Sequence, residues 1–388
     1  MNAAPHPDEL LAAAPRPSPF AIRHRDDQSA ARAGVLQTAH GAVDTPTFMP
    51  VATQGTVKGI TTRQLRDAGA QIILSNIYHL SLRPGVETLE ALGGLHRFMG
   101  WDGAILTDSG GFQVMSLATL RKVSDEGVLF QSHLDGARLH FTPEDVVGRQ
   151  HRLGVDVLMV LDELVPAGAA PAVVAAAMRR TTDWAWRSSR VPIGPDRHLF
   201  AIVQGGFDPA LRREHATQLA AGGFPGYAVG GLSVGEERGL TREVAGVTAA
   251  ALPVDRPRYL MGVGLPQDLL RLIGMGYDLF DCVLPTRNGR NASCFTTAGR
   301  VNMRLARHAR DEQPIDPTCG CEACRSVSRA YVRHLCVAGE MLGAQLASLH
   351  NVHFYLDLMR QARAHVAAGD YAAWATARAE AMDRAEEA

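Results

Sequence analysis

Asp281 ends a short apolar run in the stretch YDLFDCVLPTRNGR (277–290). The run predicts a buried strand that delivers this carboxylate at its carboxyl end, and Pro285 then breaks the chain into a loop that carries Arg287 and Arg290. A carboxylate there is a poor phosphate ligand but a good nucleophile toward an electron-poor carbon, whereas the two guanidinium groups suit phosphate. On this stretch alone, a helix N-cap or an ion-pair role for Asp281 is an equal alternative.

Two further carboxylates stand in the same kind of place. Asp108 follows the apolar run ILT, and Asp162 follows MVL. Two other runs end in polar or glycine-rich segments, QGG (204–206) and GGL (230–232). Each acid taken singly is as easily explained as a helix N-cap, but three acids at the same end of one parallel sheet are harder to explain by capping alone. We therefore expect these residues to converge on one rim.

Three of the six cysteines crowd into one short segment at C-x-C-x2-C spacing: Cys319, Cys321 and Cys324. The sequence shows no secretory signal, so disulfides are not the default. Three thiolates supply three of the four ligands that tetrahedral zinc requires. His350 is the leading candidate for the fourth, and His353 competes with it. A site with no open position indicates a structural zinc ion rather than a catalytic one.

The same region is locally basic. The formal net charge of the chain is -1, which argues against a wholesale polycation. Between residues 286 and 333, however, nine arginines stand against four acids. One basic lobe beside the expected active rim fits a polyanion that docks there, and a solvated charged surface is the alternative.

The elements that must position these groups follow a βα alternation, which is typical of a parallel sheet. Eight strands are expected at residues 47–51, 71–74, 103–107, 156–161, 199–204, 227–230, 258–261 and 278–281. Helices between them have good starts, such as Thr142-Pro143 and Asp208-Pro209. Eight such strands predict an α/β protein with a (β/α)8 TIM barrel, in which chemistry gathers at the carboxyl ends of the strands. Segment 114–139 has hairpin character in place of a simple helix.

The predicted domains follow from this pattern. Residues 1–19, rich in Ala and Pro, lack the features of a signal peptide and predict a flexible tail. The other predicted units are a barrel core at 20–290, a zinc-binding subdomain at 291–350 inserted after the eighth strand, and the last barrel helix with a helical tail at 351–388. No apolar run reaches the length of a membrane span, so we expect a cytoplasmic protein.

Five motifs occur in order along the chain: DSGGFQ (108–113), GG (205–206), YAVGGL (227–232), MGVG (261–264) and DCVLPTR (281–287). Together with the cysteine cluster and His350, they resemble the motifs of bacterial tRNA-guanine transglycosylases, from about Phe20 to the last helix. The resemblance implies that guanine 34 in the anticodon of GUN tRNAs (for Asp, Asn, His and Tyr) is replaced by preQ1, in queuosine biosynthesis.

The resemblance also implies roles for the acids. Exchange of a base at C1′ with retained configuration calls for two displacements, as in retaining glycosidases. Asp281 would be the nucleophile that forms a covalent ribosyl-enzyme, and Asp108 would be the general acid and base for the purine. The family's substrate-binding positions correspond to Asp162, Gln204, Gly231, Leu232, Phe112, Met261, Ser109 and Glu236, and its RNA-binding positions to Arg287 and Arg290.

By similarity, each part of the base has a partner. Asp162 would accept hydrogen bonds from the amino and ring N–H edge, while Gln204 and the Gly231 N–H would read the carbonyl. The Leu232 carbonyl, with Glu236 near, would receive the aminomethyl group of preQ1. Phe112 and Met261 would sandwich the purine, which an anticodon loop can unstack at low cost.

One departure bears on the incoming base. After Asp162-Glu163 the bacterial pattern usually has cysteine, whereas Leu164 stands here. Val234 keeps the bulk of the bacterial residue where queuine-using eukaryotic enzymes have a smaller one. We therefore expect preQ1, with direct use of queuine as the alternative. The resemblance also implies a homodimer, with Tyr331 and His334 near the contact.

The residues argue against two other classes of protein. A metal-dependent barrel hydrolase would carry His-x-His at the end of the first strand, and FMPV (48–51) has no such pair. A non-catalytic tRNA-binding partner subunit would have lost its acids, yet Asp108, Asp162 and Asp281 all stand.

Overall fold

The computed structural model describes residues 18–117 and 121–387. The tail predicted for residues 1–19 therefore lies almost wholly outside the described residues. Within the described part, no helix combines the length and the apolar character needed to cross a bilayer.

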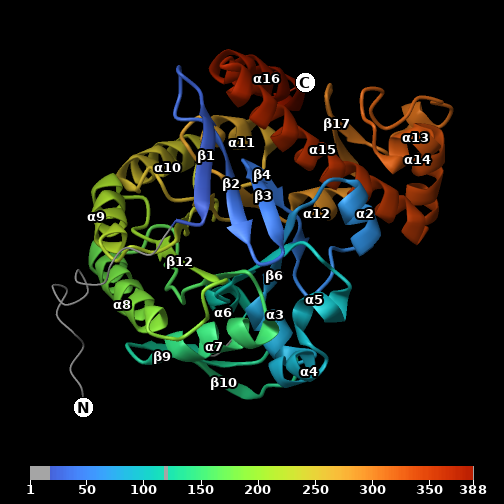
Figure 1. The fold of residues 1–388 in the computed structure, drawn as a ribbon. Coiled ribbons are helices and arrows are strands. Elements are labelled where there is room, and N and C mark those ends of the chain that lie inside the picture. The colour runs from blue at the N-terminus through green and yellow to red at the C-terminus, as the bar shows by residue number, and fades with distance from the viewer. Residues whose placement is uncertain (1–17, 118–120, 388) are drawn as a thin grey trace.

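A parallel barrel forms the centre of the molecule (Figure 1). Its strands are β4 (Thr47–Met49), β5 (Val51–Ala52), β6 (Ile72–Asn76), β7 (Ala104–Asp108), β11 (Val157–Met159), β12 (His198–Val203), β13 (Gly226–Val229), β14 (Arg258–Leu260) and β15 (Leu279–Asp281). They pair in the order β4-β15-β14-β13-β12-β11-β7-β6-β5. Only Pro50 separates β4 from β5, and its carbonyl accepts a hydrogen bond from Leu74 N–H at 3.1 Å. The ring is thus nearly closed, which confirms the predicted TIM barrel.

The helices of the barrel region surround this ring (Figure 1). They are α2 (Thr62–Asp67), α3 (Ile77–Leu82), α4 (Val86–Ala91), α5 (Gly94–Met99), α6 (Gly111–Leu117), α7 (Pro143–Leu153), α8 (Pro171–Ser189), α9 (Pro209–Ala220), α10 (Arg238–Ala251), α11 (Pro266–Ile273) and α12 (Leu284–Arg290). The predicted starts are confirmed: Thr142 caps α7 through its hydroxyl, and the Asp208 carboxylate caps α9. Apolar side chains from strands and helices fill the space between the two layers and form one continuous core.

A three-stranded antiparallel sheet, which we did not predict, covers the amino end of the barrel. It consists of β1 (Phe20–Arg25), β2 (Arg32–Thr38) and β3 (Gly41–Thr45), drawn in blue in Figure 1. Arg32 forms a buried ion pair with Asp278, just before β15, at 2.6 Å. His40 Nδ1 lies 2.8 Å from Asp156, just before β11. Both anchors lie at the starts of barrel strands, so the carboxyl ends are left for a substrate.

Two insertions depart from the simple alternation. The first is a meander of β8 (Arg121–Ser124), β9 (Gly127–Gln131) and β10 (Arg138–Phe141), as the hairpin character of 114–139 predicted. The second follows α12 and contains β16 (Ser293–Thr296), β17 (Gly299–Asn302), the 3-10 turn η1 (Ala306–His308), α13 (Glu322–Ser326) and α14 (Arg329–Ala338).

The chain ends in two helices, α15 (Met341–Ala368) and α16 (Tyr371–Glu387). We expected the last barrel helix to lie in the unit that begins at residue 351. Instead α15 begins soon after Gly339, and its first turn packs on α14: Gly343 lies there, where a Cβ would be 2.9 Å from Leu335 Cβ. His350 therefore lies well inside a long helix, and the predicted boundary between residues 350 and 351 falls within that helix. α16 packs on α11, where the Tyr371 hydroxyl donates to the Leu270 carbonyl at 2.6 Å.

Candidate active site and metal centre

The carboxyl ends of the barrel strands surround a cavity of about 480 Å³. Most of the predicted site residues line it: Asp108, Ser109, Phe112, Asp162, Gly231, Leu232, Glu236, Met261, Asp281 and Arg287. Gln204 stands behind Asp162 rather than among the lining residues, and Arg290 lies outside the cavity on the exposed side of α12. Residues far apart in the chain therefore meet in one space of the size expected for a small-molecule site.

Asp281 is the last residue of β15 and faces this cavity. Its Oδ1 atom accepts hydrogen bonds from the Tyr259 hydroxyl at 2.6 Å and from Gly262 N–H at 2.9 Å. Burial raises the pKa of Asp281, and the two hydrogen bonds oppose that rise. Neither donor contacts Oδ2, so that oxygen is the one available to attack a carbon atom in the cavity.

Asp108 ends β7 in a different environment. Ile77 N–H donates to its Oδ1 at 3.2 Å, and the Asn76 side-chain amide donates to its Oδ2. Burial, reinforced by the nearby charges of Asp281 and Asp162, raises the pKa of Asp108 to about 8. A carboxyl group that holds its proton at neutral pH can act as a general acid beside an ionised neighbour.

Asp162 is held by side chains from two neighbouring segments. The Ser109 hydroxyl donates to Oδ1 at 2.7 Å, and the Gln204 amide donates to Oδ2 at 2.6 Å. Burial raises the pKa of Asp162, while these hydrogen bonds oppose the rise. Gly111 also approaches closely, since a Cβ there would lie 2.7 Å from Asp162 Oδ1. The carboxylate is thus immobilised as an acceptor at one end of the cavity.

The loop after β13 forms another part of the cavity wall. Gly231 has φ +71°, and Leu232 is buried. The Glu236 carboxylate accepts hydrogen bonds from the N–H groups of Ser233 and Val234 and from the Thr241 hydroxyl at 2.6 Å. Glu236 therefore organises the loop in this structure, although it was predicted to lie by an aminomethyl group.

Aromatic and thioether side chains flank the cavity. Phe112, at the start of α6, is 53% exposed and lines the cavity. Met261 follows β14 and is only partly exposed. An exposed ring that lines a cavity is suited to stacking on a planar ligand.

Sequence reasoning missed two contributors to the site. Tyr259 lies within an expected strand, and nothing in its position along the chain signals that its hydroxyl reaches Asp281. Asn76 ends β6 just as Asp108 ends β7, in register with it. A polar residue at the carboxyl end of a barrel strand is itself a signal that could have identified Asn76.

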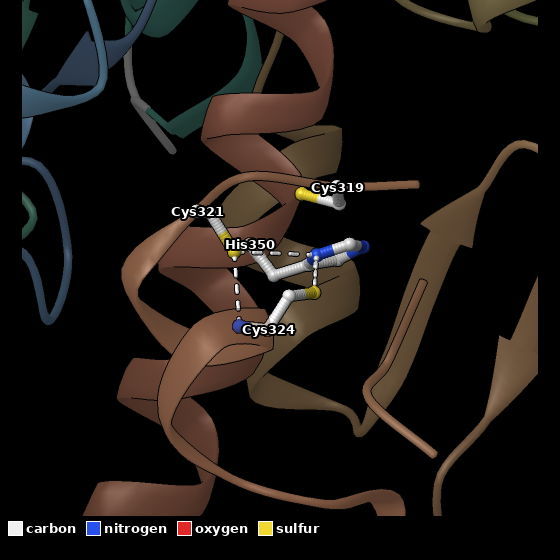
Figure 2. A group of neighbouring side chains, drawn as sticks. All are labelled: Cys319, Cys321, Cys324 and His350. Carbon is white, nitrogen blue, oxygen red and sulfur yellow. Dashed lines mark hydrogen bonds between the residues drawn. The ribbon is translucent and has the colours of Figure 1, made fainter. Parts of the chain in front are cut away.

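The cysteine cluster assembles around α15 (Figure 2). The ligand atoms of Cys319, Cys321, Cys324 and His350 all lie within 4.8 Å of one another. His350 Nδ1 lies 3.2 Å from Cys324 Sγ and 3.6 Å from Cys321 Sγ. His353 Nδ1 lies 3.5 Å from Cys319 Sγ, and His353 is not one of the four clustered ligands.

The donor set fits zinc. His350 Nε2 lies 2.7 Å from the Phe295 carbonyl, so this nitrogen carries the proton and Nδ1 keeps its lone pair for a metal. Three thiolates and one imidazole make a closed tetrahedral set, as structural zinc sites have. The predicted ligand choice, His350 over His353, is confirmed, and the cluster is consistent with structural zinc.

The zinc-type centre is joined to the active rim by α15. Asn351, next to His350, donates to the Pro285 carbonyl at 3.0 Å, at the start of α12. α12 and α15 pack closely, since a Cβ on Gly289 would lie 2.5 Å from Ser348 N. The helix that carries Arg287 and Arg290 therefore rests directly on the helix that supplies the fourth ligand.

Comparisons with known proteins agree with this geometry. The family model described as Queuine tRNA-ribosyltransferase matches residues 26–384. The protein of that name from Solidesulfovibrio magneticus is 54% identical over 346 residues, which cover 89% of this chain and 93% of the relative. Those from Pelotomaculum thermopropionicum and Desulforudis audaxviator are 51% and 53% identical over 350 residues, covering 90% of this chain and 95% and 94% of the relatives. The chain therefore belongs to the queuine tRNA-ribosyltransferase family.

Proposed function

We propose that this protein exchanges guanine 34 in the anticodon of GUN tRNAs for preQ1, by double displacement through a ribosyl adduct on Asp281. The observation that carries the proposal is the pair of carboxyl groups in one cavity. Asp281 receives hydrogen bonds that favour its ionised form, whereas burial keeps Asp108 protonated to about pH 8. Two carboxyl groups with such different environments divide the roles of nucleophile and acid.

In the first displacement, Asp281 Oδ2 forms a bond to C1′ as the bond from C1′ to the guanine nitrogen breaks. Asp108 donates its proton to the departing base, which leaves neutral. In the second displacement, Asp108 takes a proton from the incoming base. The nitrogen of that base attacks C1′ and releases Asp281, so configuration is retained after two inversions.

Recognition of the base uses the walls of the cavity. Asp162 accepts hydrogen bonds from the amino and ring N–H edge, and Ser109 holds it from the side at 2.7 Å. The Gly231 N–H reads the carbonyl, while Phe112 and Met261 sandwich the purine. Gln204, expected to read the carbonyl as well, holds Asp162 from behind in this structure. Leu164 lies against Gly231, 3.3 Å from where a Cβ would be. Val234 also lines the cavity, and it has the bulk of the bacterial residue where queuine-using eukaryotic enzymes have a smaller one, which favours preQ1 over queuine.

The polyanionic partner is tRNA. The reaction takes place in the cytoplasm, where the tRNA substrate is found. Arg287 and Arg290 are exposed on α12 and would hold the nucleotides that flank the extruded guanine. A bound zinc ion would cross-link the loop at 319–324 to α15 and so hold the helix on which α12 rests. Its role is structural, and no step of the exchange passes through it.

We also propose a homodimer through the outer face of the zinc-binding lobe. Exposed apolar side chains lie just before η1, on α14 and at the start of α15: Leu305, Tyr331, Val337, Met341 and Leu342. Met341 is 81% exposed, and an isologous contact would cover it. Light scattering should give twice the monomer mass, and Met341→Glu should shift the protein toward monomer. A monomer at all concentrations in the wild type would contradict the dimer.

The proposed function is tested by measuring which free base, preQ1 or queuine, is incorporated into tRNA. Purified protein is mixed with GUN tRNA that carries radiolabelled guanine 34, and then with preQ1 or queuine. We expect release of label with preQ1 and little or none with queuine. Release with queuine but not with preQ1 would overturn the base assignment, and no release with either base would overturn the exchange itself.

The rate should depend on pH in a bell shape. Asp108 must be protonated to donate, and its pKa is about 8, so kcat falls as the pH rises through about 8. Asp281 must be ionised to attack, and its pKa is raised, so the rate also falls at acid pH. In Asp108→Asn, the slow residual rate should lose the alkaline limb. An unchanged alkaline limb in that variant would assign it to another group.

A further inference from the structure

We propose that Arg212 and His215, on the inner face of α9, are positioning residues that hold the two base-reading loops in place. These loops are QGG (204–206) after β12 and GGL (230–232) after β13. The inference rests on the proposed function, because it assigns these residues to the presentation of Gln204 and Gly231 to the base. Neither Arg212 nor His215 lines the cavity, so neither is a catalytic residue.

Arg212 is fully buried and binds only backbone carbonyls. Its Nε donates to Gly206 O at 2.8 Å, and its Nη1 donates to Val203 O at 3.1 Å and to Gly230 O at 2.7 Å. A longer contact, 3.4 Å, joins Nη2 to Gly231 O. No carboxylate in the described part of the chain forms an ion pair with it. Burial lowers the pKa of Arg212 to about 10, so the group remains charged at neutral pH.

Two of the four carbonyls that Arg212 holds, Val203 O and Gly230 O, belong to the peptide units that carry the N–H groups of Gln204 and Gly231. A trans peptide is planar, so its N–H points opposite to its C=O. The Gly230 carbonyl and the Gly231 N–H share one such unit. Arg212 therefore turns the Gly231 N–H away from α9, in the orientation that the predicted reading of the base requires.

His215 holds the neighbouring peptide from the other side. Its Nδ1 accepts the Gln204 N–H at 2.9 Å, and its Nε2 lies 3.1 Å from the Thr182 hydroxyl. The side chain is fully buried, and burial lowers the pKa of His215 to about 4, so it is neutral with its proton on Nε2. The carbonyl of the same peptide, Val203 O, is held by Arg212 and by Gly230 N–H at 3.0 Å.

The two loops need these hydrogen bonds because their own backbone does little to fix their conformation. Gly205, Gly206 and Gly231 have φ of +137°, +57° and +71°, conformations that side-chain-bearing residues rarely adopt. Glycine-rich backbone outside regular structure is flexible unless its polar groups are bound. One rigid guanidinium fork with four carbonyl contacts supplies that binding, and a lysine has neither the shape nor the number of donors to replace it.

The test compares Arg212→Lys with Arg258→Lys. Arg258 is a matched control because it too is buried, donates to backbone carbonyls (Leu252 O and Pro253 O), and has its pKa lowered to about 10. It lies at the start of β14, at the other end of the barrel. Both variants should lose thermal stability. Only Arg212→Lys should raise KM for the free base, by about tenfold or more, with a smaller change in KM for tRNA.

A second pair of variants distinguishes loss of one hydrogen bond from a general failure to fold. In His215→Asn, the amide oxygen can accept the Gln204 N–H in place of Nδ1, whereas His215→Leu has no acceptor. We expect His215→Asn to keep KM for the base close to wild type and His215→Leu to raise it. Hydrogen exchange of segments 203–206 and 230–232 should be faster in Arg212→Lys and His215→Leu but unchanged in Arg258→Lys.

The outcomes separate this inference from the proposed function. If the wild type exchanges bases but Arg212→Lys changes only the melting temperature, or Arg258→Lys raises KM equally, the positioning role is wrong. If the wild type does not replace guanine in tRNA, the proposed function fails. Amide hydrogen-exchange rates of the two loops then decide whether α9 holds them. Equal amide hydrogen-exchange rates of these loops in Arg212→Lys and in the wild type would overturn the positioning role of α9 as well.

Discussion

Asp281→Asn is expected to abolish the covalent adduct between protein and tRNA and to lower kcat by about four orders of magnitude or more. The amide oxygen is a far weaker nucleophile than a carboxylate, yet the side chain keeps its shape, and its oxygen can still accept from Tyr259 and Gly262. Affinity for tRNA should be nearly unchanged, because phosphate contacts supply most of it. The adduct is measured by denaturing electrophoresis after incubation with labelled tRNA, and affinity by filter binding.

Asp278→Asn is the matched control. Asp278 lies in the same stretch but is fully buried, and it pairs with Arg32 at the opposite end of the strand. Its loss should lower stability, since an unpaired buried guanidinium remains, while the folded protein still forms the adduct. An adduct in Asp281→Asn would show that another group is the nucleophile.

Cys321→Ser is expected to release the zinc ion and to destabilise the carboxyl-terminal lobe by several kcal/mol, roughly, because metal binding and folding are coupled in such sites. Cys321 Sγ also caps α13 by accepting Cys324 N–H at 3.4 Å. Loss of the ion frees the loop from His350 and loosens α15 beneath α12. Affinity for tRNA should therefore fall as well. Metal content by atomic emission, thermal melting and filter binding measure the three effects.

Cys336→Ser provides the comparison. Cys336 is buried on α14 in the same lobe, but it is outside the ligand cluster. Its replacement should cost only about 1 kcal/mol of packing and leave the metal content at one ion per chain. An unchanged melt of Cys321→Ser, together with no metal in the wild type, would refute the zinc site.

Local signals in the sequence were sufficient to predict the barrel and to identify the metal ligands. Alternating apolar runs and helix starts such as Thr142-Pro143 indicate βα units, because burial on both faces of a parallel strand demands them. The acids of the site were recognisable because each follows such a run. The cysteine spacing likewise needs only the coordination number of zinc to predict a fourth ligand.

Other features depend on contacts between distant segments, which no local pattern reports. The β1–β3 sheet forms between sequence neighbours, but its position over the amino end of the barrel depends on Asp278 and Asp156, each more than a hundred residues from its partner in the sheet. The start of α15 was misplaced because its first residues form a helix that packs on α14, and apolar periodicity there is weak.

The sequence by itself determined the family of this protein, its metal-ligand set and the residues proposed to carry its chemistry, because spacing and residue type are local properties. Only the tertiary structure decided the state of each group. The raised pKa of Asp108, the Tyr259 hydroxyl on Asp281 and the clamp of Arg212 on two glycine loops all arise from burial and hydrogen bonds across the barrel. Proton affinity and orientation are set by surroundings, and those surroundings come from segments that meet only when the chain has folded.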